Sequence, residues 1–317
     1  MTDRTAKKRH LPPSLEIVLP ATSANLGPAF DAAALAFAMF LRVRASAAND
    51  FSIAARGRDR EICGQIDNHL ILKTYREVLR AEGKQAQPLT LRIENEIPIG
   101  KGCGSSAAAR LAGIALAVHF GRLRWTDSRI VREAARLEHH PDNAAACWMG
   151  GLAVARISAA GEAQIAHLTP KGKWPLLFAV PDESLSTEDA RRALPDQYSR
   201  ADVVANIQNS MLLLAAFLQG RKDLLAAALE DRIHQPFRAS LCPLLPALQK
   251  LTGTPGILGV ALSGAGPSVL VFLDPKSNAA GTRMRVRDHL RVQGLCAKLI
   301  STEITTRGAR RRNVLKP

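Results

Sequence analysis

The spacing of apolar residues along the chain predicts a mixture of strands and helices. Residues 89–93 alternate apolar and polar side chains, with Leu89, Leu91 and Ile93 on one face, which is the period of a strand. Residues 68–82 instead repeat apolar positions at helical spacing. A short apolar run at 15–19 ends at Pro20, which suits a strand followed by a turn at 22–28.

The same reading extends over the rest of the chain. Further strands are predicted at 40–46, 51–55, 152–157, 175–180, 257–262, 268–273 and 297–305. Further helices are predicted from about Asp31 and at 105–119, 127–138, 187–194, 201–219, 221–230, 241–251 and 277–292. A polar region at about 160–173 lacks clear periodicity, so we expect a boundary there between two structural units.

Composition excludes several classes of protein. The chain has 317 residues, of which 47% are hydrophobic, so it is not a disordered chain. Its longest apolar runs are too short to span a bilayer, and no secretory signal is evident near the N-terminus. The five cysteines lie more than thirty residues apart, which excludes a CxxC metal site and argues against a disulfide scaffold. We therefore expect a reduced, cytoplasmic protein without a membrane segment.

The net charge of +15 is concentrated at the two ends of the chain. Residues 1–10 have a net charge of +3 and residues 307–317 a net charge of +5. We interpret 1–14 and 307–317 as solvated basic tails. Nucleic-acid binding is the alternative interpretation, but aromatic residues make up only 4% of the chain, which leaves few surfaces for base stacking.

The strongest chemical signal is a glycine-rich loop at 98–108, between a predicted strand and a predicted helix. Gly100, Gly102 and Gly104 alternate and lead into Ser105 and Ser106. Glycines allow the backbone to approach a ligand closely, and a helix N-terminus presents free N–H groups that suit phosphate. The order of residues fits neither the Walker A pattern nor the dinucleotide GxGxxG pattern. Taken alone, the loop could also be a structural turn.

Three other segments combine polar residues with turn signals. They are Pro20–Asp31, which contains Asn25; Glu138–Asn143, which reads Glu-His-His-Pro-Asp-Asn; and Ser263–Ser268, which reads Ser-Gly-Ala-Gly-Pro-Ser. Each could be an ordinary capped turn or helix end. Because His139 and His140 are adjacent, they cannot face one ligand from a regular helix, so a histidine metal site is not expected.

Together, in this order and spacing, the four segments resemble the GHMP small-molecule kinases, and within them the homoserine kinases. The Ala-Asn-Leu-Gly-Pro run at 24–28 and the His-Pro-Asp-Asn run at 140–143 favour the homoserine kinases over the mevalonate kinase and galactokinase relatives. A further likeness lies at 186–195, and Pro236-Phe-Arg238 resembles a later Pro-x-Arg of that family. Ala29 and Cys103 depart from the family pattern without removing a polar contact residue.

The resemblance implies an α+β fold with two halves. The N-terminal half, 15–165, would resemble ribosomal protein S5 domain 2 and bind ATP. The C-terminal half, 166–306, would be ferredoxin-like, with the active site between the halves. A homodimer is a further expectation from the family.

The resemblance also implies the reaction and its residues. ATP, with Mg²⁺, would phosphorylate the side-chain hydroxyl of L-homoserine, a step of threonine biosynthesis. The ATP phosphates would lie on Pro98, Ile99, Gly100, Lys101, Gly102, Cys103, Gly104, Ser105, Ser106, Ala107 and Ala108. Ser106 (or Ser105) and Glu138 would hold Mg²⁺. L-homoserine would contact Asn25, Asp31, Thr187, Arg191 and Arg238.

Two questions stay open at this level. Asp142 could be a catalytic base, or His140, Asp142 and Asn143 could serve only to position the reacting groups, because phosphoryl transfer depends mainly on alignment and charge stabilisation. The acceptor could also be another small alcohol, although two arginines suit a substrate that carries a carboxylate.

Overall fold

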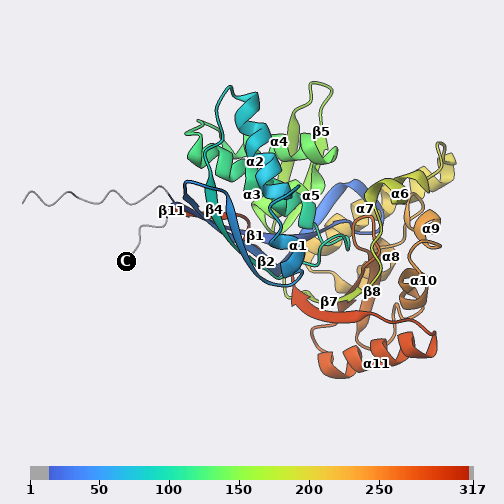
Figure 1. Cartoon of the computed structure of the whole chain (residues 1–317). Coiled ribbons are helices and arrows are strands. Elements are labelled where there is room, and N and C mark those ends of the chain that lie inside the picture. Colours follow the sequence, from blue (N-terminus) through green and yellow to red (C-terminus); the bar gives the residue numbers. More distant parts are fainter. Residues whose placement is uncertain (1–13, 314–317) are drawn as a thin grey trace, which may run out of the picture.

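The computed structural model describes residues 14–313 and consists of two halves, each built on one β-sheet (Figure 1). The predicted tail at 1–14 lies, except for Ser14, outside the described residues, as do residues 314–317. Both described ends of the chain meet at one edge of the N-terminal sheet, where the last strand pairs with the first.

Within the described residues, the N-terminal sheet has seven strands. These are β1 (Ser14–Asn25), β2 (Ala29–Ala47), β3 (Ser52–Gly57), β4 (Leu89–Asn95), β5 (Leu152–Ile157), β6 (Ala163–Leu168) and β11 (Arg310–Asn313). Five of them run in the order β11-β1-β2-β4-β3, and β5 pairs with both β2 and β6. The helices of this half are α1 (Arg60–Cys63), α2 (Leu70–Ala81), α3 (Ser105–Phe120), α4 (Asp127–Glu138) and α5 (Asp142–Met149).

Helices α2 to α5 lie on one side of this sheet (Figure 1). The apolar face of α2 that the sequence predicts is buried, including Leu72, Tyr75 and Leu79. Gly113 of α3 faces α2, and a Cβ there would lie 2.5 Å from the carbonyl oxygen of Ile71. The absence of a side chain at this position therefore lets the two helices pack closely.

The C-terminal half has a four-stranded sheet in the order β10-β7-β9-β8. Its strands are β7 (Pro175–Val180), β8 (Ile257–Leu262), β9 (Val269–Leu273) and β10 (Lys298–Glu303). Its helices are α6 (Thr187–Arg192), α7 (Arg200–Gln219), the 3-10 helix η1 (Lys222–Leu224), α8 (Leu225–Ala228), α9 (Gln235–Arg238), α10 (Leu244–Gln249) and α11 (Ala279–Val292).

The two halves share a hydrophobic core, which fixes one half relative to the other. Phe37 of β2 and Phe178 of β7 are fully buried, and their rings meet edge to face at 4.9 Å. Phe178 and Phe217 of α7 belong to the same buried cluster as Ile17 and Leu19 of β1. Because interiors of this kind are closely packed, a site between the halves has stable walls.

Helix α7 is long and apolar enough, by length and composition alone, to cross a membrane. In the structure only three of its apolar side chains, Leu213, Ala216 and Phe217, are buried, whereas others such as Ile207 and Met211 are exposed. Asn206 and Ser210 both donate hydrogen bonds to the carbonyl oxygen of Pro28, at 2.7 and 2.9 Å. These contacts make α7 part of the C-terminal half, next to the turn that follows β1.

The predicted helix from Asp31 is wrong: this segment is the first half of β2. Ala34, Leu35, Ala36 and Phe37 pair with β1, and residues 33–35 pair with β5 on the other side. Alanine is the best helix former, but helix propensity amounts to less than about 1 kcal/mol per residue, and the hydrogen bonding and burial supplied by the two flanking strands outweigh it. The first strand likewise continues through Pro20 to Asn25, so the turn covers only 26–28.

The expected boundary region at 160–173 contains β6, which forms a hairpin with β5 of the N-terminal sheet, and β7 of the C-terminal sheet begins at Pro175. One prediction about chain organisation is corrected. The basic segment 307–317 is not wholly a solvated tail, because Arg310–Asn313 pairs with β1 as an edge strand. Arg311 in addition forms an ion pair of 2.6 Å with Asp127. The run of basic residues near the chain end therefore contains a strand, and its pairing partner lies almost 300 residues earlier in the sequence.

Candidate active site

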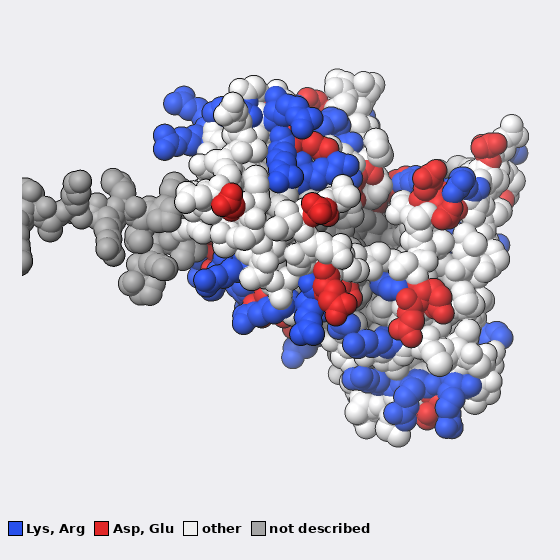
Figure 2. Space-filling model, viewed as in Figure 1, with Lys and Arg blue, Asp and Glu red and all other residues white. Residues whose placement is uncertain are grey.

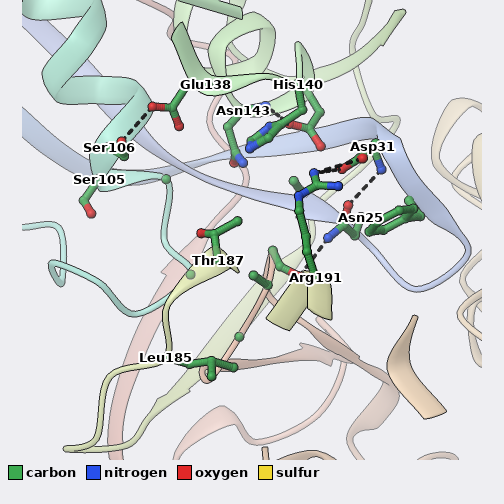
Figure 3. Close-up of a pocket in the computed structure, with 18 of the residues that line it drawn as sticks. Asn25, Asp31, Ser105, Ser106, Glu138, His140, Asn143, Leu185, Thr187 and Arg191 are labelled. Atoms are coloured by element: carbon green, nitrogen blue, oxygen red, sulfur yellow. Dashed lines mark hydrogen bonds and ion pairs between the residues drawn. The ribbon is translucent and has the colours of Figure 1, made fainter. Parts of the chain in front are cut away.

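A cavity of about 120 Å³ lies where the two halves meet, and most of the predicted site residues line it (Figure 3). Space-filling Figure 2 shows the molecule hollowed between its two lobes. The lining includes Asn25, Asp31, Gly100, Gly102, Gly104, Ser105, Ser106, Glu138, His140, Asp142, Asn143, Thr187, Arg191 and Arg238. Phe30, Leu185 and the turn Gly264–Gly266 complete it. Folding therefore brings together segments more than 200 residues apart in the sequence.

The glycine loop is held against the turn that joins β8 and β9. Gly100, Gly102 and Gly104 all have positive φ, from 68 to 75°, a region that glycine adopts without strain. Ser263 Oγ donates a 2.7 Å hydrogen bond to the carbonyl oxygen of Gly102. A Cβ at Gly102 would lie 2.2 Å from the carbonyl oxygen of Ser263, so only glycine fits. The loop ends at the N-terminus of α3, whose free N–H groups and dipole favour an anion.

Not every residue of the predicted phosphate segment reaches this cavity. Pro98, Cys103, Ala107 and Ala108 are buried in the protein, and Ile99 faces a second cavity. Lys101 donates from Nζ to the carbonyl oxygen of Asp182, so its ammonium group braces the loop against the segment after β7. Burial raises the pKa of the Cys103 thiol to about 12, which makes it a packing residue.

Ser106 and Glu138 lie together at the start of α3 and the end of α4. Ser106 Oγ donates to Glu138 Oε1 at 2.7 Å, and Arg110 Nε donates to the same oxygen at 2.5 Å. Hydroxyl and carboxylate oxygens are ligands of the kind that Mg²⁺ prefers, usually together with phosphate oxygens and waters. The donor set at this position therefore fits the predicted ion.

His140, Asp142 and Asn143 form a short hydrogen-bonded network at the start of α5. His140 Nδ1 donates to Asp142 Oδ1 at 2.7 Å, and the backbone N–H of Asn143 donates to the same oxygen. Thr22 Oγ1 donates to Asn143 Oδ1 at 2.7 Å, and this contact does not use the N–H groups of the Asn143 side chain. The second oxygen of Asp142 is buried without a hydrogen-bond partner among the described residues. The network fixes the imidazole and the amide at the cavity wall.

The pKa of His140 is raised above its ordinary value. Burial acts to lower it, but the hydrogen bond and negative charge of Asp142 outweigh burial, with smaller contributions from Glu138 and Asp31. Since the folded protein binds this proton more tightly than the unfolded chain, the stabilisation is fully present below the ordinary histidine pKa, about 6.5. It is lost as pH rises through the raised pKa.

This shift predicts a pH-dependent effect of His140→Gln on stability. The loss in unfolding free energy relative to the parent will be larger at pH 5.5 than at pH 9, because only the parent gains the protonated pair. Urea denaturation at both pH values measures it. In an Asp142→Asn background the loss should no longer be larger at pH 5.5, because burial then acts without the Asp142 charge that opposes it. A loss that grows with pH contradicts the assignment.

Asp31 and Arg191 form an ion pair across the cavity, in which one guanidinium nitrogen contacts both carboxylate oxygens (Figure 3). Arg191 Nη2 lies 2.8 and 2.9 Å from the two carboxylate oxygens. Asp31 adopts positive φ, and its backbone N–H donates to Asn25 Oδ1 at 3.0 Å. Asn25 Nδ2 in turn donates to the carbonyl oxygen of Gly264 at 2.8 Å. Asn25 thus joins the β1–β2 turn to the β8–β9 turn and holds Asp31 in place.

Arg238 is the other cation of the cavity, and its surroundings differ from those of Arg191. It is 1% exposed, and no carboxylate among residues 14–313 lies within ion-pair distance of its guanidinium. Burial, and then the charge of Arg191, lower its pKa, but an arginine remains protonated in proteins. A buried cation without a counter-ion is a prepared binding position for an anion.

A second cavity of about 430 Å³ lies on the other side of the glycine loop. The two cavities share Gly100, Ser105 and Ser106. Its wall is mainly apolar, including Ile62, Leu70 and Ile97, and has a few polar groups, among them Asn68 and Asn95. The sequence does not single out these residues, because they are dispersed and look like ordinary core positions. An apolar cavity with a few polar groups is typical of a small-molecule site.

Comparison with known proteins agrees with this geometry. The family model described as "GHMP kinases N terminal domain" matches residues 69–151. The family model described as "GHMP kinases C terminal" matches residues 213–291. A homoserine kinase of Solibacter usitatus is 45% identical over 81% of this chain and 84% of its own length. The homoserine kinase of Deinococcus radiodurans is 34% identical over 91% of this chain and 94% of its own length.

Solved structures agree on the fold. The homoserine kinase of Cytophaga hutchinsonii superposes with a TM-score of 0.78 over 98% of this chain and 100% of its own, at 21% identity. The L. major mevalonate kinase gives a TM-score of 0.66 over 96% and 98%, at 14% identity. At such identities the likeness concerns the fold alone, and the predicted α+β class is confirmed. By the identity and coverage of its sequence relatives, the chain belongs to the homoserine kinase family of the GHMP kinases.

Proposed function

We propose that the protein transfers the γ-phosphoryl group of ATP to the side-chain hydroxyl of L-homoserine, giving O-phospho-L-homoserine and ADP. The observation that carries this proposal is that one cavity contains both a glycine loop at a helix N-terminus and Arg238, a buried cation that lacks a carboxylate partner. The first suits a phosphate and the second suits the carboxylate of an amino acid. The 45% identical homoserine kinase supports the same assignment.

ATP would occupy both cavities. Its nucleoside would lie in the larger, apolar cavity beside Ile62, Leu70 and Ile97, where Asn68 offers hydrogen bonds to polar edges. The Asn95 amide is already bonded to the backbone of Arg58 and Ile97 and shapes the wall. Its phosphates would cross Gly100, Ser105 and Ser106, which the two cavities share. This placement brings the γ-phosphate into the smaller cavity, where the acceptor would bind.

Ser106 and Glu138 would hold Mg²⁺. When bound, the ion neutralises negative charge that develops between the β- and γ-phosphates. Before the ion arrives, the Ser106–Glu138 hydrogen bond keeps the two ligands at 2.7 Å, so little rearrangement is needed. Arg110 donates to the same carboxylate oxygen and helps to hold it in place.

The amino acid would be held at both of its charged ends. Arg238 would take the carboxylate, with Arg191 beside it, and Asp31 would take the ammonium group. Thr187 lies on the same wall and offers a hydroxyl. His140 and Asn143 would orient the acceptor hydroxyl for in-line attack on the γ-phosphate. Alignment of this kind can supply a large part of the catalysis without a base.

Asp142 serves here as a positioning residue for His140 and Asn143, because the oxygen that faces them already accepts two hydrogen bonds. Asp142→Asn keeps an oxygen at that position and should retain turnover within about tenfold of the parent, whereas loss of a catalytic base typically costs 10²–10⁴. Steady-state kinetics with saturating ATP measure the change. A loss beyond 100-fold, in a variant with an unchanged melting temperature, would make Asp142 the base.

The alternative acceptor is another small alcohol. ADP release measured with L-homoserine, L-threonine, mevalonate and galactose at equal concentrations distinguishes the candidates. We expect L-homoserine to give the highest kcat/KM. Good activity on mevalonate or galactose and none on L-homoserine would overturn the proposed acceptor.

An RNA-binding function is not favoured. On the face in Figure 2, Lys and Arg lie in separate groups with Asp and Glu between them.

A further inference from the structure

The guanidinium of Arg238 is oriented by neutral groups only. Its Nε donates to the carbonyl oxygen of Ala190 at 2.9 Å, and its Nη1 lies 3.2 Å from His234 Nδ1. Because a guanidinium can only donate, His234 Nδ1 must be unprotonated and accept this hydrogen bond. A carboxylate at the same place would neutralise Arg238 and compete with an incoming anion, whereas a neutral acceptor leaves the full charge available.

The protonation state of His234 is fixed from its other side. Its Nε2 lies 2.8 Å from the carbonyl oxygen of Gly27, which can only accept, so Nε2 carries the proton. The side chain is fully buried, and burial, the largest effect, lowers the pKa of His234 to about 4. Asp231, 3.5 Å from Nε2, opposes that shift but is occupied by backbone N–H groups of residues 233–235. The imidazole is therefore a neutral single tautomer at physiological pH.

The remaining contacts hold the imidazole rigidly. His234 lies directly before the short helix α9, four residues from Arg238, so one turn of helix presents both side chains together. The ring of Phe30 stacks on His234 with 5.3 Å between centroids, and the Arg238 guanidinium lies 5.2 Å from the same ring. Gln235 Oε1 accepts from the backbone N–H of Leu262 at 2.7 Å, which fastens α9 to β8.

We propose that His234 is a positioning residue that aims the charged guanidinium of Arg238 at the substrate carboxylate, and thereby favours acceptors that carry one. This inference rests on the proposed function. His234 lines neither the smaller nor the larger cavity, so it acts through Arg238 rather than by touching the acceptor. The link from Gly27 through His234 to Arg238 also ties the carboxylate position to the β1–β2 turn that carries Asp31.

A double-mutant cycle tests the proposal, with His234→Leu, Arg238→Met and the combined variant. A hydrogen bond to a charged group contributes enough that His234→Leu should lower kcat/KM for L-homoserine by about 10- to 100-fold, mainly through KM. The KM for ATP should stay within about twofold of the parent, since the nucleotide does not contact this residue. In the Arg238→Met background the same His234→Leu change should cost less than about threefold, because the group it positions is gone.

Two further variants and one substrate separate positioning from folding. His234→Asn places an oxygen near the former Nδ1 position. It should bring the KM for L-homoserine most of the way back to the parent value. His119→Leu, which removes a partly buried imidazole whose Nε2 has no partner among the described residues, should leave kcat/KM unchanged. With 3-aminopropan-1-ol, which is homoserine without its carboxylate, His234→Leu should have no effect on turnover.

An additive loss in the Arg238→Met background would overturn the inference, as would an equal loss with 3-aminopropan-1-ol or a His234→Asn variant as impaired as His234→Leu. These outcomes are distinct from failure of the proposed function, in which the parent protein itself does not phosphorylate L-homoserine.

Discussion

Arg238→Met will lower kcat/KM for L-homoserine by at least about 30-fold, since truncating one partner of a buried, hydrogen-bonded charge pair costs about 2–5 kcal/mol and each 1.4 kcal/mol is tenfold. Arg238 is 1% exposed and has no carboxylate partner among the described residues, so the substrate would supply its only counter-ion. Without the guanidinium, the substrate carboxylate would be desolvated against the apolar face of Phe30. The loss should appear chiefly in the KM for L-homoserine, with the KM for ATP unchanged.

The same variant should not destabilise the free protein. A buried cation without a counter-ion is costly to desolvate, and relief of that cost offsets the two hydrogen bonds lost at Ala190 and His234, so Arg238→Met should leave the melting temperature nearly unchanged. Arg191→Met is the matched control, because Arg191 is already paired with Asp31 and its side chain is 39% exposed. We expect the smaller loss there. An equal loss for both arginines, or a marked fall in melting temperature for Arg238→Met, contradicts a prepared carboxylate position.

Gly102→Ala is expected to reduce kcat/KM by about 100-fold or more, because a 1 Å misplacement of reacting groups can cost that much. The added Cβ would lie 2.2 Å from the carbonyl oxygen of Ser263 and 2.8 Å from that of Gly266. Both contacts are backbone atoms, so no flexible side chain can move aside. The glycine loop must then shift away from the β8–β9 turn, and the KM for ATP should rise together with the loss in kcat.

Gly83→Ala provides the control for backbone strain. Gly83 has φ of 66°, close to the 75° of Gly102, but a Cβ there meets nothing within 4 Å. It should lower stability by about 1 kcal/mol, the cost of left-handed backbone in a residue other than glycine, without changing kcat or KM. Similar kinetics in the two variants would show that the contact between the loop and Ser263 has no role in catalysis.

Local pattern predicts much of this fold. The predicted strand at 89–93 and the predicted helix at 68–82 have regular apolar periods, and they agree with β4 and α2 to within two residues at each end. The pattern fails where long-range pairing decides the outcome. Ala33 to Phe37 form a strand because β1 and β5 flank them, and Arg310–Asn313 form one because β1 has a free edge. Neither partner can be recognised from the neighbouring sequence.

The site shows the same division. Contiguous motifs make Ser106, Glu138 and Arg191 visible in the sequence, and all three line the cavity. His234 gives no such signal, because its importance depends on Gly27, 207 residues away. The apolar wall of the larger cavity is equally hidden, since nothing in the sequence distinguishes Ile62 and Ile97 from other apolar positions.

The most direct test of the account is ³¹P NMR of the parent protein with ATP, Mg²⁺ and L-homoserine. A carboxylate held by Arg238 and a hydroxyl aligned with the γ-phosphate predict one new phosphomonoester signal that grows in step with ADP. The mass of the product that gives this signal should equal that of O-phospho-L-homoserine. ADP accompanied only by inorganic phosphate, or a new phosphomonoester that appears with another alcohol and not with L-homoserine, would contradict the account.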